Sequence, residues 1–306
     1  MAVHLVETNY TDQSEVAATY VVTHDDGVYL CETNTAYAVP AILAKVADLG
    51  FGPSDVTHII ITHIHLDHAG GASALMRQCP QAVLLAHPKA APHAIDPSKI
   101  VAGATAVYGE AAFAKMYGTI GTIDASRVQA IDDGTSLDVG GHRLRFLHTR
   151  GHANHHMVIH DLAESAVFTG DSFGIAYPGL AGTLFPSTSP TDFDAEAALN
   201  SLDIIVRTSA QTAWLTHFGA IRDLPAAAAA MAPQLRAYGE LVERLDASGR
   251  EGADLLGAAH TAVDAFFDAL VPNPTPAQRG LIDIDRDLNG QGVAVAVERR
   301  RFRRNR

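Results

Sequence analysis

Hydrophobic and polar positions follow two different patterns along this chain, and the change comes near residue 222. Before it, short apolar runs such as "THIIIT" and "AVLLAHP" are bounded by glycine, proline and aspartate, which predicts buried strands. Between the runs, Ile42, Val46 and Leu49 recur at helical spacing. Strands that alternate with helices predict an α/β architecture for this part of the chain.

The strand-rich region has two halves, on either side of residue 125. The second half contains the short apolar runs "MVIHDL", "AVFTGDS" and "AWLTHFG", each followed by turn residues or a glycine. A helical insertion at about residues 95–123 lies between the halves. We therefore expect two similar sheets within one domain of residues 1–222.

After residue 222 the strand pattern ends and helical periodicity replaces it. Leu235, Tyr238, Val242 and Leu245 fall on one helical face, and "PNPTP" punctuates the chain before a last helix. We expect residues 223–306 to form a helical C-terminal extension. It either covers the site or provides a dimer contact, so a homodimer is an open alternative.

The charge of the chain argues against a nucleic-acid enzyme. The formal net charge is −12, and the segment from Arg299 to Arg306 holds six of the 22 basic residues, so the rest carries −18. An acidic body repels polyphosphates. The arginine-rich tail indicates either a solvated terminus or a phosphate-binding arm.

Other features of the composition predict a soluble, cytoplasmic protein with no membrane partner. No apolar run approaches the length of a membrane span, and the first residues lack the order of a signal peptide. The two cysteines, Cys31 and Cys79, have no CxxC spacing, so we expect buried free thiols.

The segment "THIHLDHAGG" carries the strongest chemical signal in the chain. His63, His65 and Asp67 alternate directly after the apolar strand, so an extended backbone projects them to one side, and His68 follows. A catalytic zinc ion commonly takes about three protein ligands plus water. Further donors must therefore come from elsewhere in the chain.

Three more metal-competent residues stand at the ends of later apolar runs. They are His152 in "TRGHANHH", Asp171 in "VFTGDS" and His217 in "WLTHFG". His156, four residues after His152, is a candidate for orienting a ligand or for touching substrate.

This ordered set of motifs, HxHxDH and then His, Asp and His, resembles the metallo-β-lactamase-fold superfamily of metallohydrolases over about residues 15–220. The resemblance implies an αββα sandwich with metal ions at one edge. It assigns His63, His65 and His152 to one ion, Asp67, His68 and His217 to a second, and Asp171 as the bridge between them. Two divalent metal ions are expected, zinc first, with iron or manganese as alternatives.

The resulting hypothesis is hydrolysis of a small organic ester, thioester or lactone. A metal-bound hydroxide would attack the carbonyl, and Asp67 would orient the nucleophile or accept its proton. Acyl-homoserine lactonases carry a catalytic tyrosine shortly after the bridging aspartate, but here Tyr177 lies six residues beyond Asp171. A non-catalytic or weakly catalytic metal-containing binding or regulatory protein and a phosphodiesterase remain the alternatives.

Overall fold

The computed structural model describes residues 2–188 and 192–304 of the chain. These residues form two compact units. The first unit runs up to His148 and adds His155–Gly170 and Thr208–Arg222. The second unit comprises Thr149–Asn154, Asp171–Arg207 and the residues from Asp223 onward. Each unit is described separately below.

The first unit contains a six-stranded sheet in which strands follow sequence order, β1-β2-β3-β4-β5-β6. Its first three strands pair antiparallel, and β3 to β6 pair parallel. The strands are β1 (Val3–Glu7), β2 (Ala18–His24), β3 (Gly27–Cys31), β4 (Val56–Ile60), β5 (Val83–Ala86) and β6 (Val128–Ala130). The parallel strands end at one edge of the sheet, where the chain leaves β4 for the histidine-rich segment.

A second six-stranded sheet in the same unit has the order β12-β11-β10-β9-β8-β7. Only β10 and β11 pair parallel, and the other neighbours are antiparallel. The strands are β7 (Ser136–Val139), β8 (His142–His148), β9 (Met157–Asp161), β10 (Ala166–Gly170), β11 (Thr212–Leu215) and β12 (Gly219–Ile221). The two sheets expected from the sequence are therefore present, but the division between them comes after β6 and before β7 rather than at residue 125, because β6 pairs with β5 in the first sheet.

One apolar core lies between the two sheets. Tyr20 and Tyr29 of the first sheet belong to the same buried cluster as Phe146, Phe168 and Trp214 of the second. The ring of Tyr20 lies 5.3 Å from that of Trp214 and 5.4 Å from that of Phe168. Burying one large apolar side chain contributes about 1.5–3 kcal/mol, so this layer joins the sheets face to face.

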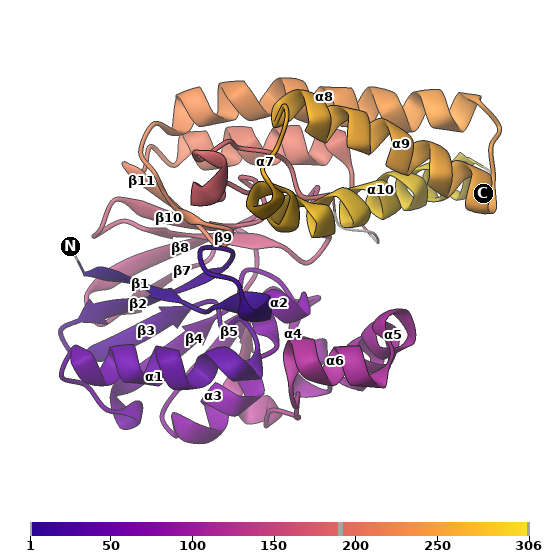
Figure 1. Cartoon of the computed structure of the whole chain (residues 1–306). Helices are drawn as coiled ribbons and strands as arrows, with labels where there is room; N and C mark the ends of the chain where they lie inside the picture. Colours follow the sequence, from indigo (N-terminus) through magenta and orange to yellow (C-terminus); the bar gives the residue numbers. More distant parts are fainter. Residues whose placement is uncertain (1, 189–191, 305–306) are drawn as a thin grey trace. The chain divides into compact units, whose positions relative to one another are not determined.

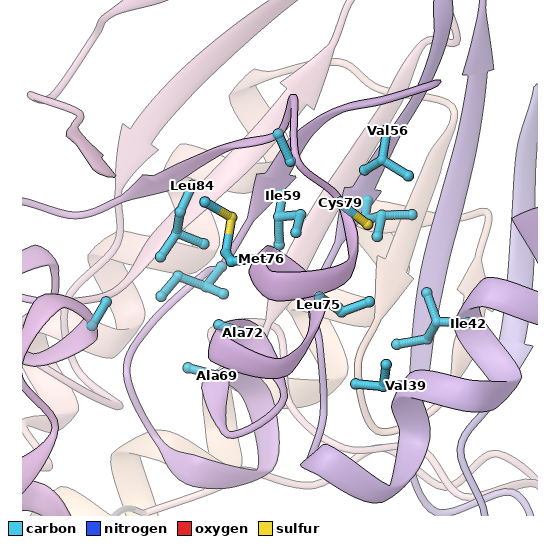
Figure 2. Packing of buried hydrophobic residues seen from close by; sticks show 14 of the residues in the cluster. Val39, Ile42, Val56, Ile59, Ala69, Ala72, Leu75, Met76, Cys79 and Leu84 are labelled. Carbon is cyan, nitrogen blue, oxygen red and sulfur yellow. The ribbon is translucent and has the colours of Figure 1, made fainter. Parts of the chain in front are cut away.

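A second apolar core lies on the other face of the first sheet, under helices (Figure 2). Met76 lies beside Ile59 and Leu84, and Leu75 lies toward Ile42 and Val39 of α1 in the same cluster (Figure 2). The helices of the first unit are α1 (Val39–Asp48), α2 (Leu66–Ala69), α3 (Ala72–Gln78), α4 (Ala91–Ile95), α5 (Ser98–Tyr108) and α6 (Glu110–Tyr117). Helices α4 to α6 occupy most of the segment expected to be a helical insertion.

Short 3-10 turns connect several of these elements. They are η1 (Tyr10–Asp12), η2 (Ala36–Ala38), η3 (Pro53–Asp55), η4 (Ala125–Arg127) and η5 (Pro178–Leu180). Turns η1 and η2 matter below, because η1 lies in the loop that contains Val16 and η2 follows Asn34, and both Val16 and Asn34 contact the histidine-rich region.

The second unit is helical. Its helices are α7 (Ala195–Arg207), α8 (Leu224–Ala247), α9 (Gly252–Leu270) and α10 (Pro276–Arg304). Tyr238 of α8 packs its ring 5.0 Å from that of Phe266 of α9, and it accepts a hydrogen bond from Asn289 of α10 at 3.2 Å. The three C-terminal helices thus share one buried interior (Figure 1).

The arginine-rich tail belongs to this helical unit as far as the structure describes it. Arg301 and Arg304 bind the carboxylate of Asp246 at 2.9 and 2.8 Å, and Arg299 binds Asp192 at 2.8 Å. These arginines are therefore structural ion-pair partners within the second unit. The last residues of the predicted tail, Asn305 and Arg306, lie outside the described residues.

The fold class expected from the sequence is confirmed: two mixed sheets pack face to face, with helices outside the first sheet and a helical C-terminal region (Figure 1). Cys31 and Cys79 are free and buried, as predicted. Among the described residues, no helix combines the length and the apolar character that a membrane crossing requires. The division at residues 222 and 223 stays a prediction about domains, since the second compact unit also takes in two earlier segments.

Candidate metal centre

The histidine-rich segment begins where β4 leaves the core. Ile59, Ile60 and Ile61 have no exposed surface, and neither do Thr62 and His63. The chain bends at Thr62 and His63, returns to an extended conformation at His65, with φ −61° and ψ 148°, and enters α2 at Leu66. The buried isoleucines therefore hold the start of the segment in place, and the bend brings its side chains together just after the strand.

Four side chains of this segment lie together. His63 Nε2 is 2.9 Å from His65 Nδ1, and the ring of His63 lies 4.0 Å from that of His68. Asp67 Oδ2 is 3.7 Å from His68 Nε2. Three imidazoles and one carboxylate thus converge although they come from only six consecutive residues.

His217 reaches this cluster from the other sheet of the first unit. It follows β11, and its Nε2 atom lies 3.4 Å from Asp67 Oδ2. Its Nδ1 atom lies 2.8 Å from the backbone carbonyl oxygen of Val16. Because a carbonyl only accepts hydrogen bonds, Nδ1 donates to Val16, which leaves Nε2 as the ring nitrogen that faces Asp67.

The donor set in the first unit fits a divalent cation. Asp67, His68 and His217 each offer one ligand atom, and these atoms lie within 4.8 Å of one another. Imidazole nitrogen and carboxylate oxygen are ligands that zinc, iron and manganese accept. The side chains are buried or half-buried, so each is held in position by its surroundings.

Behind the histidines lies Glu32, a buried acid that the sequence analysis missed. Its Oε1 atom accepts hydrogen bonds from the Thr62 backbone N–H at 3.2 Å and from the Thr62 hydroxyl. Thr62 Oγ1 is 3.0 Å from His63 Nδ1, and Glu32 Oε1 is 3.5 Å from His68 Nδ1. With the hydroxyl proton directed to Glu32, Nδ1 of His63 must donate, which leaves Nε2 as its ligand atom.

No pattern in the sequence marks Glu32, because it is a single acid after an apolar strand. It is 1% exposed, and its Oε2 atom has no hydrogen-bond partner among residues 2–188 and 192–304. A buried carboxylate is costly unless it is paired, so its place beneath two histidines indicates a function in orienting them.

The predicted ligand orienter His156 does lie beside a ligand candidate. Its ring centroid is 4.8 Å from that of His63, and the side chain has no exposed surface. The preceding residue, His155, which the sequence analysis did not single out, lies 5.4 Å from the ring of His65. Both histidines belong to the first unit.

In the second unit, the structure brings together the two remaining predicted ligands. His152 Nε2 lies 3.4 Å from Asp171 Oδ2, and both side chains are buried. His152 Nδ1 is 3.1 Å from the carbonyl oxygen of Ser187, so this imidazole also directs Nε2 toward its carboxylate neighbour. Each unit therefore gathers its own share of the predicted site. The assignment of all seven residues to a single centre stays a prediction.

Tyr177, the displaced counterpart of the lactonase tyrosine, belongs to the second unit and is 2% exposed. Its hydroxyl lies 3.1 Å from Asp285 Oδ2. A different tyrosine, Tyr10, lies close to the first-unit cluster. Burial raises the pKa of Tyr10 well above its ordinary value, and the Asp67 carboxylate raises it further.

Comparison with known proteins places this geometry in context. The sequence profile of the metallo-beta-lactamase superfamily matches residues 15–217. The chain is 26% identical over 222 residues to the metallo-beta-lactamase fold-containing protein ST1585 of Sulfurisphaera tokodaii, which covers 71% of this chain and 78% of that protein. The crystal structure of ST1585 superposes with a TM-score of 0.68 at 19% identity, covering 95% and 98% of the two chains.

Two further relatives extend this picture. The metallo-beta-lactamase family protein TTHA1429 of Thermus thermophilus superposes with a TM-score of 0.65 at 20% identity, covering 98% of this chain and 94% of that one. An atrochrysone carboxyl ACP thioesterase of Aspergillus fumigatus is 25% identical over 208 residues, which is 68% of this chain but only 38% of that protein. The structural likenesses show the fold, and the thioesterase shows one activity named among relatives.

Proposed function

Because this chain belongs to the metallo-beta-lactamase superfamily, we propose that it is a hydrolase that uses two divalent metal ions to cleave a small ester, thioester or lactone. The family and its thioesterase-named relatives support hydrolysis in general. The proposed ligands are His63, His65, Asp67, His68, His152, Asp171 and His217.

One observation carries the proposal. Asp67 and His68 lie in α2, after a strand of the first sheet, and His217 follows β11 of the second sheet, yet their ligand atoms lie within 4.8 Å of one another. His217 is also held by a backbone carbonyl in the tautomer that a metal ligand requires. Ordinary packing does not require two imidazoles and a carboxylate to converge, whereas a cation does.

The chemistry divides between the ions and the chain. When bound, divalent ions lower the pKa of water to about 7 and polarise a carbonyl oxygen. Asp67 is half-buried, so its carboxylate can orient an attacking water molecule and accept its proton. Thr62 and Glu32 hold the ring of His63, and Val16 holds the ring of His217.

The substrate proposal is a carboxylic ester, a thioester or a lactone. It is supported by the thioesterase-named relatives and by the acidic charge of the chain, which disfavours polyanionic substrates. Zinc is proposed first because imidazole and carboxylate ligands suit it, with iron and manganese as alternatives.

The test measures metal content and turnover on the same preparations. Wild-type protein, His217→Ala and the matched control His58→Ala, a half-buried histidine in β4, are loaded with zinc, iron or manganese. Each is assayed on p-nitrophenyl acetate, a thioester, a γ-lactone and bis(p-nitrophenyl) phosphate. We expect about two metal ions per chain and carboxylic ester or thioester hydrolysis that His217→Ala abolishes and His58→Ala retains.

Two outcomes would contradict the proposal. Full metal content without turnover on any substrate would favour a binding or regulatory protein. If only the phosphodiester is hydrolysed, the proposed metal centre still stands, but the proposed substrate class of carboxylic esters, thioesters and lactones is wrong.

A further inference from the structure

A hollow of about 390 Å³ opens in the first unit, between the loop from β1 to β2 and helix α6. Tyr10 and Thr11 line it from the loop, Thr35 and Tyr37 from the segment around η2, and Met116 from α6. The volume is within the range of small-molecule pockets. None of these residues belongs to the proposed ligand set.

The hollow adjoins the histidine-rich segment through the backbone of residues 33–35. The side chain of Asn34 donates to the carbonyl oxygen of Asp67 at 2.9 Å, and the backbone N–H of Thr33 donates to that of His68 at 2.9 Å. Gly71 N–H in turn donates to the Asn34 carbonyl at 2.8 Å. The wall that carries Thr35 is therefore fixed to the backbone of two ligand candidates.

The opposite wall also reaches this segment. Tyr10 lines the hollow and lies close enough to Asp67 for the carboxylate to raise the pKa of the phenol. The same loop includes Val16, whose carbonyl holds His217. Both walls of the hollow are thus connected to residues of the Asp67, His68 and His217 group.

The chemistry of the walls is that of a hydrogen-bonding pocket. Five of the nine lining residues bear hydroxyl groups, namely Thr8, Tyr10, Thr11, Thr35 and Tyr37. The hydroxyl groups of Thr8, Thr11 and Tyr37 already donate to backbone carbonyls, so what they keep for a ligand is the capacity to accept a hydrogen bond. One acidic residue, Asp12, and one basic residue, Lys115, balance each other, and Met116 is the one aliphatic member.

The loop that carries Tyr10 and Thr11 is held in an unusual conformation. Asn9, Thr11 and Asp12 have φ values of 48°, 56° and 60°; asparagine and aspartate adopt this left-handed region comparatively easily, whereas the β-branched Thr11 is strained there. The carboxylate of Glu7 ties the loop at both ends, since it accepts from Asn9 N–H at 3.0 Å and from Glu15 N–H at 2.8 Å. These contacts hold Tyr10 and Thr11 in place along the hollow.

We propose that this hollow binds the part of the substrate next to the scissile bond, and that it selects a neutral group bearing an amide or hydroxyl function over an alkyl chain. The inference rests on the proposed hydrolase function. It names the class of ester or thioester that the site prefers. A hydroxyl oxygen of the wall can accept a hydrogen bond from an N–H or O–H group of the ligand, whereas an alkyl chain displaces water from that oxygen and offers no donor in its place.

The test compares two thioesters that differ by one amide group. S-acetyl-N-acetylcysteamine and S-pentyl thioacetate share the acetyl group and the length of the thiol chain. We expect kcat/KM to be about three- to tenfold higher for the amide-bearing substrate, which is the effect of about one hydrogen bond. The double variant Tyr10→Phe/Thr11→Val keeps the shape of the walls, and we expect it to bring this ratio close to one.

Two controls accompany the comparison. Thr261→Val removes an exposed hydroxyl of α9 in the second unit and should leave the ratio unchanged. The single variant Thr11→Ser, with Tyr10 unchanged, keeps a hydroxyl at position 11 and should show the wild-type ratio of kcat/KM values. Thermal unfolding of every variant checks that the loop substitutions leave the protein folded.

A binding experiment separates this inference from the proposed function. Wild-type protein labelled with ¹⁵N is titrated with N-acetylethanolamine and, separately, with 1-pentanol. We expect amide shifts at residues 8–12 with the first compound and none with the second.

Equal hydrolysis of both thioesters, or a preference that survives in the double variant, would overturn the inference and leave the hydrolase proposal standing. If neither thioester is hydrolysed, the result counts against the proposed function. In that case the N-acetylethanolamine shifts alone would support the hollow as a binding site, and their absence would overturn it as well.

Discussion

The Nδ1 atom of His217 lies 2.8 Å from the carbonyl oxygen of Val16, a residue 201 positions earlier in the chain. This hydrogen bond links the loop between β1 and β2 to the candidate ligand that follows β11. It fixes the tautomer of the imidazole, and it places the loop that carries Tyr10 next to the proposed centre. The carbonyl of Val16 therefore connects the candidate ligand His217 with the loop that lines the hollow.

Thr62→Val tests whether the residues behind the histidines tune metal binding. The variant removes the hydroxyl that bridges Glu32 and His63 Nδ1, so the ring of His63 loses its orientation. We expect metal affinity to fall about 10- to 100-fold, as for other partners of metal ligands. Competition with a chromogenic chelator measures this affinity.

The matched control is Thr57→Val, near the start of β4, the strand that precedes Thr62; its hydroxyl contacts His24 and the carbonyl of Val28. It should bind metal like the wild-type protein. Equal affinity in Thr62→Val would show that Glu32 and Thr62 serve packing alone.

Gly170→Ala tests the close approach of β10 to the histidine cluster. A Cβ atom at Gly170 would lie 2.5 Å from both His156 Nε2 and Thr62 Oγ1, and φ is +50°. We expect a loss of about 2–4 kcal/mol in the free energy of unfolding, from the strained backbone and from the displaced side chains. Chemical denaturation measures it.

Gly134→Ala separates the two causes. Its φ is +75°, and nothing lies within 4 Å of the added Cβ atom, so only the backbone cost of about 1 kcal/mol should remain. If both substitutions cost the same, the contacts of Gly170 with His156 and Thr62 do not matter.

The buried thiol of Cys79 should make the stability of the protein depend on pH above about pH 9. Burial raises the pKa of its thiol to about 11, against a partial lowering by Arg127. Because the folded-state pKa is raised above the ordinary value of 9.0, the native state holds the proton more tightly. The contribution to stability is complete below about pH 9 and is lost as the pH rises toward 11.

Thermal unfolding of wild-type protein and Cys79→Ala between pH 7 and 11 checks this effect. The constant offset from the missing side chain is the same at every pH, so only the difference in slope reports the thiol. We expect the wild-type protein to lose more stability than the variant above pH 9. Parallel curves would show that the thiol titrates normally.

Asp246→Asn tests the arginine cluster of the second unit. The hydrogen bond from Arg301 is the main cause that lowers the pKa of Asp246, and Arg304 adds to it. We expect a melting temperature lower by a few degrees at low ionic strength, with a smaller difference in 1 M NaCl because salt screens exposed charges.

Asp254→Asn is the control for this variant, since Asp254 makes one exposed ion pair with Arg250. Such pairs contribute little, and its melting temperature should stay close to that of the wild-type protein. A loss equal to that of Asp246→Asn would mean that the cluster has no cooperative effect.

Local patterns in the sequence are enough to predict the two sheets, the helical C-terminal region and the HxHxDH segment. The reason is that strand and helix periodicity, and the projection of alternating side chains, depend on neighbours within a few residues. His63, His65, Asp67 and His68 do converge, although the chain bends at Thr62 and His63 and α2 begins at Leu66 rather than staying extended. His217 could be named from its place after an apolar run, but its grouping with Asp67 and His68 came only from the resemblance to a known family.

The tertiary structure decided what distant segments bring to one another. Glu32 and Val16 carry no distinguishing pattern, and they contact the histidines because the sheets place β3 and the loop before β2 beside them. The arginines of α10 pair with Asp246 of α8 because two helices pack together. Such contacts follow from long-range packing rather than from local spacing, so the sequence alone determined the ligand candidates and the fold class, whereas only the folded chain determined which groups orient them.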